Sequence, residues 1–290
     1  MAFKKAVKKQ SKLRIALSGA SGSGKTMSAL ILAASIGKKI AVVDTERGSA
    51  SLYADKFDFD VLNLKPPFEP EKFISAIKEA ELGGYDVIIL DSITHEWEGE
   101  GGILDILNRL GGRMTDWGNV TPRHDRFVNA ILGSGCHVIA TMRSKTSYEA
   151  ATNDKGKTVL IKQGTAPKQR DGIDYEFTVV FDINQNHMAK ATKDRTELFD
   201  GKDFIITADT GKSIMQWLEN GAPATNDNPA TSAELLPFYN FVKKHCTPER
   251  YEEISSYGAS MAGKGELTIH QLNEFKARVE KECSFNEEVK

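Results

Sequence analysis

The chain has 290 residues and a formal net charge of −2 at pH 7, so any affinity for nucleic acid must come from a local patch. This length suffices for one α/β domain with an appendage. The sequence shows no apolar run of membrane-spanning length and no signal peptide, and its three cysteines are far apart. These features predict a cytoplasmic protein with no membrane partner and no zinc or disulfide framework.

Residues 1–12 form a basic N-terminal arm, which contains five lysines. Such an arm is either a solvated tail or a segment that docks onto nucleic acid or another subunit. Within it, Phe3 and Ala6 form the short pattern F-x-x-A.

An apolar strand over 14–18, a glycine-rich loop and an Ala/Leu/Ile-rich helix over 27–36 follow the arm. The loop fits G-x-x-x-x-G-K-[ST], the phosphate-binding P-loop, and the alternative is a flexible Gly/Ser turn. Its glycines let backbone N–H groups approach phosphate oxygens, and the helix N-terminus adds a positive dipole end. Lys25 can reach the β- and γ-phosphates, and the Thr26 hydroxyl can bind Mg²⁺. The expected nucleotide-binding residues are Gly19, Ala20, Ser21, Gly22, Ser23, Gly24, Lys25, Thr26 and Met27.

The next elements place carboxylates at strand ends. A buried strand over 40–44 is followed by Asp44 and Glu46, and Glu46 can face the γ-phosphate as the group that activates water. A short strand over 61–64 and an amphipathic helix over 69–82 come next. The apolar strand over 85–92 has the Walker B form and ends in Asp91, which with Thr26 would hold Mg²⁺.

The middle of the chain has weaker signals. We expect a helix over 103–110 and a buried strand over 136–141, after which Thr141 and Arg143 lie at the edge of the site. The polar segment 146–165 is typical of a mobile hairpin or loop. The later strands are expected over 175–182, 187–192 and 204–207.

The elements together predict an α/β fold with a doubly wound, mostly parallel sheet that ends in antiparallel edge strands. This ATPase-like core spans 13–219. Residues 220–231 have the composition of a linker. Residues 232–290 are expected to form a small helical module, with helix starts near Ser232, Thr247 and Thr268.

The order G-x-x-x-x-G-K-T, V-V-D-T-E-R and V-I-I-L-D-S resembles the RecA-like recombinase core. The chain is more closely similar to short phage-encoded RecA-like ATPases, the Sak-type single-strand annealing proteins, over about residues 12–210. The segments that carry this closer resemblance are T-E-R-G-S-A (45–50), D-S-I-T-H-E-W (91–97), T-M-R-S-K (141–145) and A-P-K-Q-R-D-G-I-D-Y-E-F (166–177).

The resemblance implies a DNA-dependent ATPase that uses ATP and Mg²⁺ and promotes annealing or strand exchange in a bacterial host cytoplasm. Glu46 would be the general base and Asp91 the Mg²⁺ partner. Subunits would form filaments or rings, so Lys168 and Arg170 would act from a neighbour like an arginine finger, or are a solvated pair. Thr141 and Arg143 would sense the γ-phosphate where RecA uses a glutamine. Phe3 and Ala6 would join subunits.

The resemblance also implies loops that contact single-stranded DNA, at about 96–123 and 146–165, and possible binding to a single-strand-binding protein. The candidates for contact with phosphates or bases are Arg113, Trp117, Arg123, Arg126, Lys145, Lys155 and Lys157. Each has the alternative of being an ordinary surface residue. His95 would link the two sites, or is structural.

Two other functions stay open at this point. In a small-molecule or nucleotide kinase, Asp44 would bind a substrate hydroxyl and 146–165 would be a lid, although this segment has none of a lid's arginines. In a non-enzymatic interaction protein, ATP would only set the conformation.

Overall fold

The computed structural model describes residues 5–152, 158–222 and 247–263, with isolated positions at 239–240, 242–243, 272, 275–276 and 279. The chain divides into two compact units, Met1–Ala222 and Pro223–Lys290. Phe3, Lys155 and Lys157 lie outside the described residues.

The described residues of the first unit form a nine-stranded sheet. The main path runs β3 (Asp60–Asn63), β2 (Ile40–Asp44), β4 (Val87–Asp91), β5 (His137–Thr152), β1 (Arg14–Gly19), β7 (Val179–Ile183), β8 (Met188–Asp194) and β9 (Asp203–Ile205). The first six of these strands are parallel, and β8 and β9 are antiparallel. This confirms the expected mostly parallel sheet with antiparallel edge strands.

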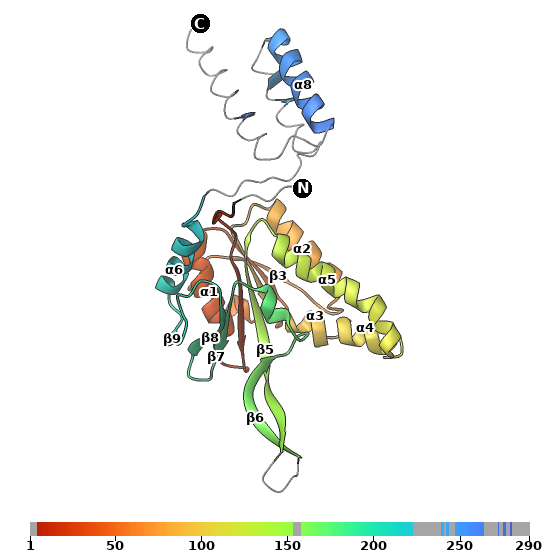
Figure 1. Cartoon of the computed structure of the whole chain (residues 1–290), viewed down its shortest axis with the longest axis vertical. Coiled ribbons are helices and arrows are strands. Elements are labelled where there is room, and N and C mark those ends of the chain that lie inside the picture. The colour runs from red at the N-terminus through yellow and green to blue at the C-terminus, as the bar shows by residue number, and fades with distance from the viewer. Residues whose placement is uncertain are drawn as a thin grey trace. The chain divides into compact units, whose positions relative to one another are not determined.

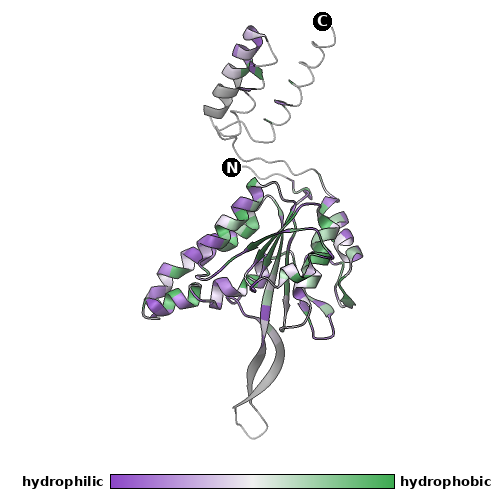
Figure 2. Ribbon diagram, turned by 180° about the vertical axis from the view of Figure 1, so that it is seen from behind, coloured by the Kyte–Doolittle hydropathy of each residue, from purple (hydrophilic) through white to green (hydrophobic). Residues whose placement is uncertain are grey.

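Helices cover both faces of the sheet (Figure 1). Helices α1 (Lys25–Ile36) and α6 (Ala208–Glu219) pack with Ile15 and Leu17 of β1 in one core. Helices α2 (Pro70–Leu82) and α5 (Trp117–Gly133) pack with Ala16 in the other. Alternate residues of β1 therefore face opposite layers, as the two-residue period of a strand requires. Figure 2 shows the apolar interior as green strands between helices with purple outer faces.

Strand β5 is unusually long, and its second half leaves the main sheet. There it pairs antiparallel with β6 (Thr158–Pro167), and the two strands form an arm that projects beyond the rest of the unit (Figure 1). The register shifts opposite Ser147 and Tyr148, where β6 carries one extra residue, Gln163, as in a bulge. Of the two alternatives predicted for 146–165, a hairpin or a loop, the structure shows a hairpin, and its first strand continues the core strand β5.

Two sequence expectations about local structure are wrong. The segment 96–123, for which the resemblance implied a DNA-contacting loop, is mostly helical: it holds α3 (Thr94–Glu98), a 3-10 helix η2 (Met114–Asp116), the start of α5, and α4 (Ile103–Arg109), which confirms the helix expected over 103–110. The strand expected over 175–182 begins only at Val179, because a 3-10 helix, η3 (Ile173–Glu176), precedes it.

The second half of the basic arm is docked onto the core. Gln10 N–H donates to the Ala222 carbonyl, and Lys8 Nζ lies 3.9 Å from the Trp217 ring centroid and donates to the Trp217 carbonyl. The solvated-tail interpretation is therefore wrong for these residues. Ala6 is exposed.

The second unit is described mainly at α8 (Pro248–Gly263), which begins at the expected Pro248 with Thr247 before it. Tyr251 N–H donates to the Thr247 carbonyl in its first turn. The expected helix starts at Ser232 and Thr268 lie outside the described residues, whereas Leu272 and Val279 are helical and buried.

A buried polar cluster joins α3, α5 and the segment after β6. Glu96 is fully buried, and its two oxygens lie 3.1 and 3.2 Å from His124 Nδ1. Gln169 Nε2 donates to the same carboxylate at 3.2 Å and to the Ile93 carbonyl at 3.1 Å. Burial raises the pKa of Glu96, and the bonds to His124 and Gln169 oppose that shift. Removing one partner of such a pair leaves a buried carboxylate without compensation.

We expect His124→Ala to lower the free energy of unfolding by about 3 kcal/mol, measured by urea denaturation near pH 7.5. The deficit should grow as the pH rises, because the unfolded chain releases the Glu96 proton more readily than the fold that buries it. His124→Gln has an amide that can donate to Glu96, so its free energy of unfolding should fall less than that of His124→Ala. A deficit of equal size in both variants, independent of pH, would show that only packing is lost.

Candidate functional site

The P-loop connects β1 to α1 at the carboxyl edge of the sheet. Gly22 and Gly24 have φ values of 80° and 90°, a region that glycine adopts at little cost, so the loop can turn its backbone toward a ligand. Lys25 Nζ donates to the carbonyls of Gly19 at 2.9 Å and Ala20 at 2.8 Å, and burial lowers its pKa. The Ser23 hydroxyl is buried without a hydrogen-bond partner among the described residues.

The two expected magnesium ligands meet directly. Thr26 Oγ1 donates to Asp91 Oδ2 at 2.6 Å, and Thr141 Oγ1 donates to Asp91 Oδ1. Asp91 is almost fully buried, and this burial raises its pKa. A hydroxyl and a carboxylate are the oxygen ligands that Mg²⁺ prefers, so these residues fit the metal that a P-loop requires. Thr141 contacts Asp91 and therefore orients a magnesium ligand.

Glu46 and Arg143 form a bidentate ion pair. Arg143 donates from Nε to Oε1 at 2.9 Å and from Nη2 to Oε2 of Glu46, and Ser92 Oγ donates to Oε1 at 3.3 Å. Partial burial opposes ionisation of Glu46, but the Arg143 hydrogen bonds and charge outweigh it and hold the pKa below its usual value. The carboxylate is thus ionised at neutral pH, as a general base must be.

These groups line one cavity of about 550 Å³ that also exposes Ser21, Gly22, Gly24 and Met27 of the P-loop. The parallel strands end at this edge, so residues far apart in the sequence converge on it. Lys25, Thr26, Glu46, Asp91 and Arg143 all lie in its wall, whereas Gly19, Ala20 and Ser23 shape the loop from behind.

The cavity contains further residues that sequence reasoning did not identify. Tyr53 of η1 (Ala50–Tyr53), Ile31 of α1 and Ile206 after β9 supply an apolar wall suited to a nucleotide base. His187, in the β7–β8 turn, donates from Nδ1 to the Ser23 carbonyl at 3.0 Å and supports the P-loop. No motif marks these positions, because each comes from a different turn or strand end.

The Asp44 carboxylate binds backbone N–H groups of the turn that follows β2. It is 1% exposed, and its oxygens accept from the N–H groups of Glu46 at 2.6 Å and Ala50 at 2.9 Å. This arrangement closes the turn after β2 and aims Glu46 into the cavity. A carboxylate with both oxygens engaged is poorly placed to bind a substrate hydroxyl, which disfavours the kinase alternative.

Lys168 and Arg170 do not line this cavity. Lys168 pairs with Glu98 at 3.0 Å and Arg170 with Asp125 at 3.0 Å, and both side chains are more than one-third exposed. The two cations follow directly on the arm, on the outer side of the cluster around Glu96.

The candidates for DNA contact are scattered. Arg123 is bidentate to Glu71, Arg126 pairs with the same carboxylate, and Arg113 pairs with Asp116. Trp117 is half-buried, its ring 6.1 Å from that of Trp97, in a small core with Ile103 and Val120. Lys145 is exposed at the root of the arm. The structure brings Arg123 and Arg126 together on Glu71, but it does not gather the described candidates into one surface.

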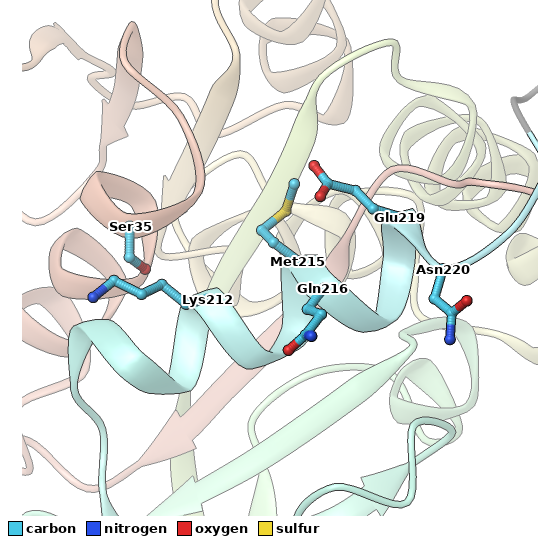
Figure 3. A pocket seen from close by; sticks show the side chains of 6 residues that line it. All are labelled: Ser35, Lys212, Met215, Gln216, Glu219 and Asn220. Atoms are coloured by element: carbon cyan, nitrogen blue, oxygen red, sulfur yellow. The ribbon is translucent and has the colours of Figure 1, made fainter.

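A separate hollow of about 630 Å³ lies along α6 (Figure 3). Its walls are Ser35 of α1 and one face of α6, from Lys212 to Asn220. Lys212 is paired with Asp209, and the opposite charge of Glu219 also borders the hollow. Its mixed charges and its distance from the P-loop in the fold exclude it as the phosphate site of this motif.

The P-loop core has a counterpart among known proteins. Residues 11–211, more than half of the chain, match a family described as an AAA domain. The chain belongs to this AAA domain family. The AAA domain is a P-loop ATPase domain, so its nucleotide site is the cavity around Lys25 and Asp91. No curated protein matches the chain.

The P-loop, Asp91 and Glu46 lie together in this AAA domain, where the sequence predicts a phosphate cradle, a metal ligand and a base, and these three roles stay predictions. ATP and Mg²⁺ are the nucleotide and metal that such a site takes. None of the helices in the described part of the chain combines the length and apolar character of a bilayer-spanning segment.

Proposed function

We propose that this AAA domain ATPase is a RecA-like, DNA-dependent ATPase of the Sak type, which promotes single-strand annealing or strand exchange in phage recombination. The observation that carries the proposal is the continuity of β5. This one strand holds Arg143 against Glu46 in the nucleotide site and then extends into a projecting arm. A partner that binds the arm is thereby connected to the catalytic base.

The arm supports the proposal further because a two-stranded hairpin is marginally stable on its own. A macromolecular partner would supply the missing contacts. Lys145 at its root is exposed and can reach a backbone phosphate, as a local basic patch on a chain of net charge −2 requires.

Assembly into a ring or filament would complete the site from a neighbouring subunit. Lys168 and Arg170 are each held by a single partly exposed ion pair, which contributes about 1 kcal/mol or less, so they are free to exchange partners. In an assembly, one of them would reach the γ-phosphate of the next subunit and stabilise its developing charge.

The proposal predicts that single-stranded DNA raises the steady-state rate of ATP hydrolysis at least about tenfold at low salt, with the stimulation falling as salt rises. The rate should be measured with single-stranded DNA, with the matching duplex and without DNA, and negative-stain images of the same mixtures should show rings or filaments. An equal rate in all three samples would contradict a DNA-dependent enzyme while leaving the ATPase itself intact.

A further inference from the structure

A second cavity of about 610 Å³ lies on the other side of the segment that carries Glu46. Its wall contains Thr45 and Arg47 from the end of β2, Asn63 and Lys65 after β3, and Phe68 and His95. Glu46 faces the nucleotide cavity, and its neighbours on both sides face this one. The two cavities thus share one short stretch of backbone as a wall.

The chemistry of this cavity favours an anion. Arg47 and Lys65 are exposed, and neither side chain forms an ion pair or hydrogen bond within the part of the chain that the structure describes. Asp44 also borders the cavity, but it is buried and both of its oxygens accept backbone N–H groups. Two unpaired cations outnumber the one carboxylate, whose oxygens are already engaged, and leave a site that a phosphate group can fill.

The remaining wall suits a larger molecule than phosphate alone. The His95 ring stacks on Phe68 with centroids 4.9 Å apart, and the Asn63 amide offers a donor and an acceptor. A cavity of this volume is in the range of about 300–1,000 Å³ that small-molecule sites occupy.

We propose that this cavity binds the phosphate of a nucleotide, either a free nucleotide or one unit of a single strand, and that the bound ligand acts on Glu46. The proposed action of the ligand on Glu46 rests on the proposed role of Glu46 in hydrolysis. Thr45 links the two sides, because its hydroxyl lies 2.7 Å from His95 Nδ1 and accepts from the Ser92 N–H at 2.8 Å. Ser92 in turn donates to Glu46. A ligand that draws Arg47 outward pulls directly on the adjacent Glu46.

Binding is tested by calorimetry on the full chain with the P-loop saturated by Mg²⁺ and ADP. The probes are thymidine monophosphate and an oligothymidylate of about 12 nucleotides, a length within usual single-strand site sizes. The variants are Arg47→Ala/Lys65→Ala and the matched control Lys78→Ala, which removes an exposed lysine of α2. ADP affinity of each variant reports whether the fold is intact.

We expect the double variant to bind at least one probe about tenfold more weakly than the control. Loss of thymidine monophosphate binding identifies a free nucleotide as ligand. Loss of oligothymidylate binding alone, with the salt slope reduced by about 1.4 for two phosphate contacts, identifies a single strand. Equal binding by the double variant and the control, or no binding of either probe to the native chain, overturns the site.

The effect on Glu46 is tested by the ratio of ATPase rates with and without the probe that binds. We expect this ratio to differ from one in the native chain and to approach one in the double variant. A probe that binds without changing the ATPase rate overturns the proposed action on Glu46 but leaves the binding site intact. A single strand that stimulates the double variant as well as the control supports the proposed DNA-dependent function but overturns this site as its route.

Discussion

Replacing Glu46 with glutamine should lower the turnover number for ATP hydrolysis by about 10²–10⁴-fold, because the amide cannot accept the proton of the attacking water. The side chain keeps its shape and one acceptor oxygen, so the P-loop and its nucleotide affinity should be preserved. The measurement is the steady-state release of phosphate together with ADP and ATP binding by calorimetry.

Glu79→Gln is the matched control for Glu46→Gln, since Glu79 is an exposed carboxylate on α2 and borders no part of the nucleotide cavity. It should hydrolyse ATP at the native rate. Should Glu46→Gln retain native turnover, Glu46 would not be the base. Retained binding with lost turnover would also set aside the alternative in which ATP only sets conformation.

Replacing Arg143 with alanine should lower turnover by about 10³-fold, the lower end of the contribution that an arginine makes to phosphoryl transfer. Arg143 lines the same cavity as Lys25 and Asp91, and the γ-phosphate of ATP competes with Glu46 for its guanidinium. We expect bound nucleotide to draw Arg143 onto the phosphate, which would release Glu46 to act on water. Turnover at saturating ATP is the quantity to measure.

The pH profile distinguishes this role from a merely structural one. Arg143 holds the pKa of Glu46 below its usual value against the effect of burial, so its removal leaves burial to raise that pKa. The acid limb of kcat/KM, which reports the nucleotide-free enzyme, should therefore move to higher pH in Arg143→Ala. Arg143→Lys keeps the positive charge but cannot form the bidentate pair. The acid limb of its profile should therefore lie between those of the native chain and Arg143→Ala. An acid limb of kcat/KM at the native position in Arg143→Ala would contradict the control of the Glu46 pKa by Arg143 in the nucleotide-free enzyme.

The parts of the site that the sequence predicts are those with local signals. The P-loop, Asp91 and Glu46 each end an apolar strand, and parallel strands deliver their carboxyl ends to one edge. Their convergence therefore follows from the pattern of buried strands, without knowledge of strand order. Thr141 and Arg143 could be placed at that edge for the same reason.

What the sequence could not predict depends on pairing across the fold. The contact of Arg143 with Glu46 requires that β4 lie between β2 and β5, and no local signal sets this order. The sequence already places Thr141 and Arg143 at the end of the core strand, where RecA uses a glutamine, but it does not show what Arg143 contacts there. Gln169 instead lies in the cluster with Glu96.

Two further elements, α5 and the arm, could not be predicted from local composition. The resemblance implied a DNA-contacting loop over about 96–123, but α5 begins within it in spite of Gly118 and Pro122, residues that favour loops. The helix holds Arg123 and Arg126 against Glu71 of α2. The polar, Gly-containing segment 146–165 was expected as a hairpin or loop, and no local signal showed that its ladder, which depends on the backbone, continues a core strand.

Strand β5 belongs to two sheets at once, and this gives the molecule a mechanical property. Its first half is clamped between β4 and β1, and its second half stands free of the core in the arm. The register shifts opposite Ser147 and Tyr148, where β6 carries one extra residue, Gln163, and a bulge of this kind bends the strand that contains it. Arg143 lies just before the part of β5 that enters the arm. We therefore expect a force applied to the arm to displace Arg143 relative to Glu46 and to change the rate of hydrolysis.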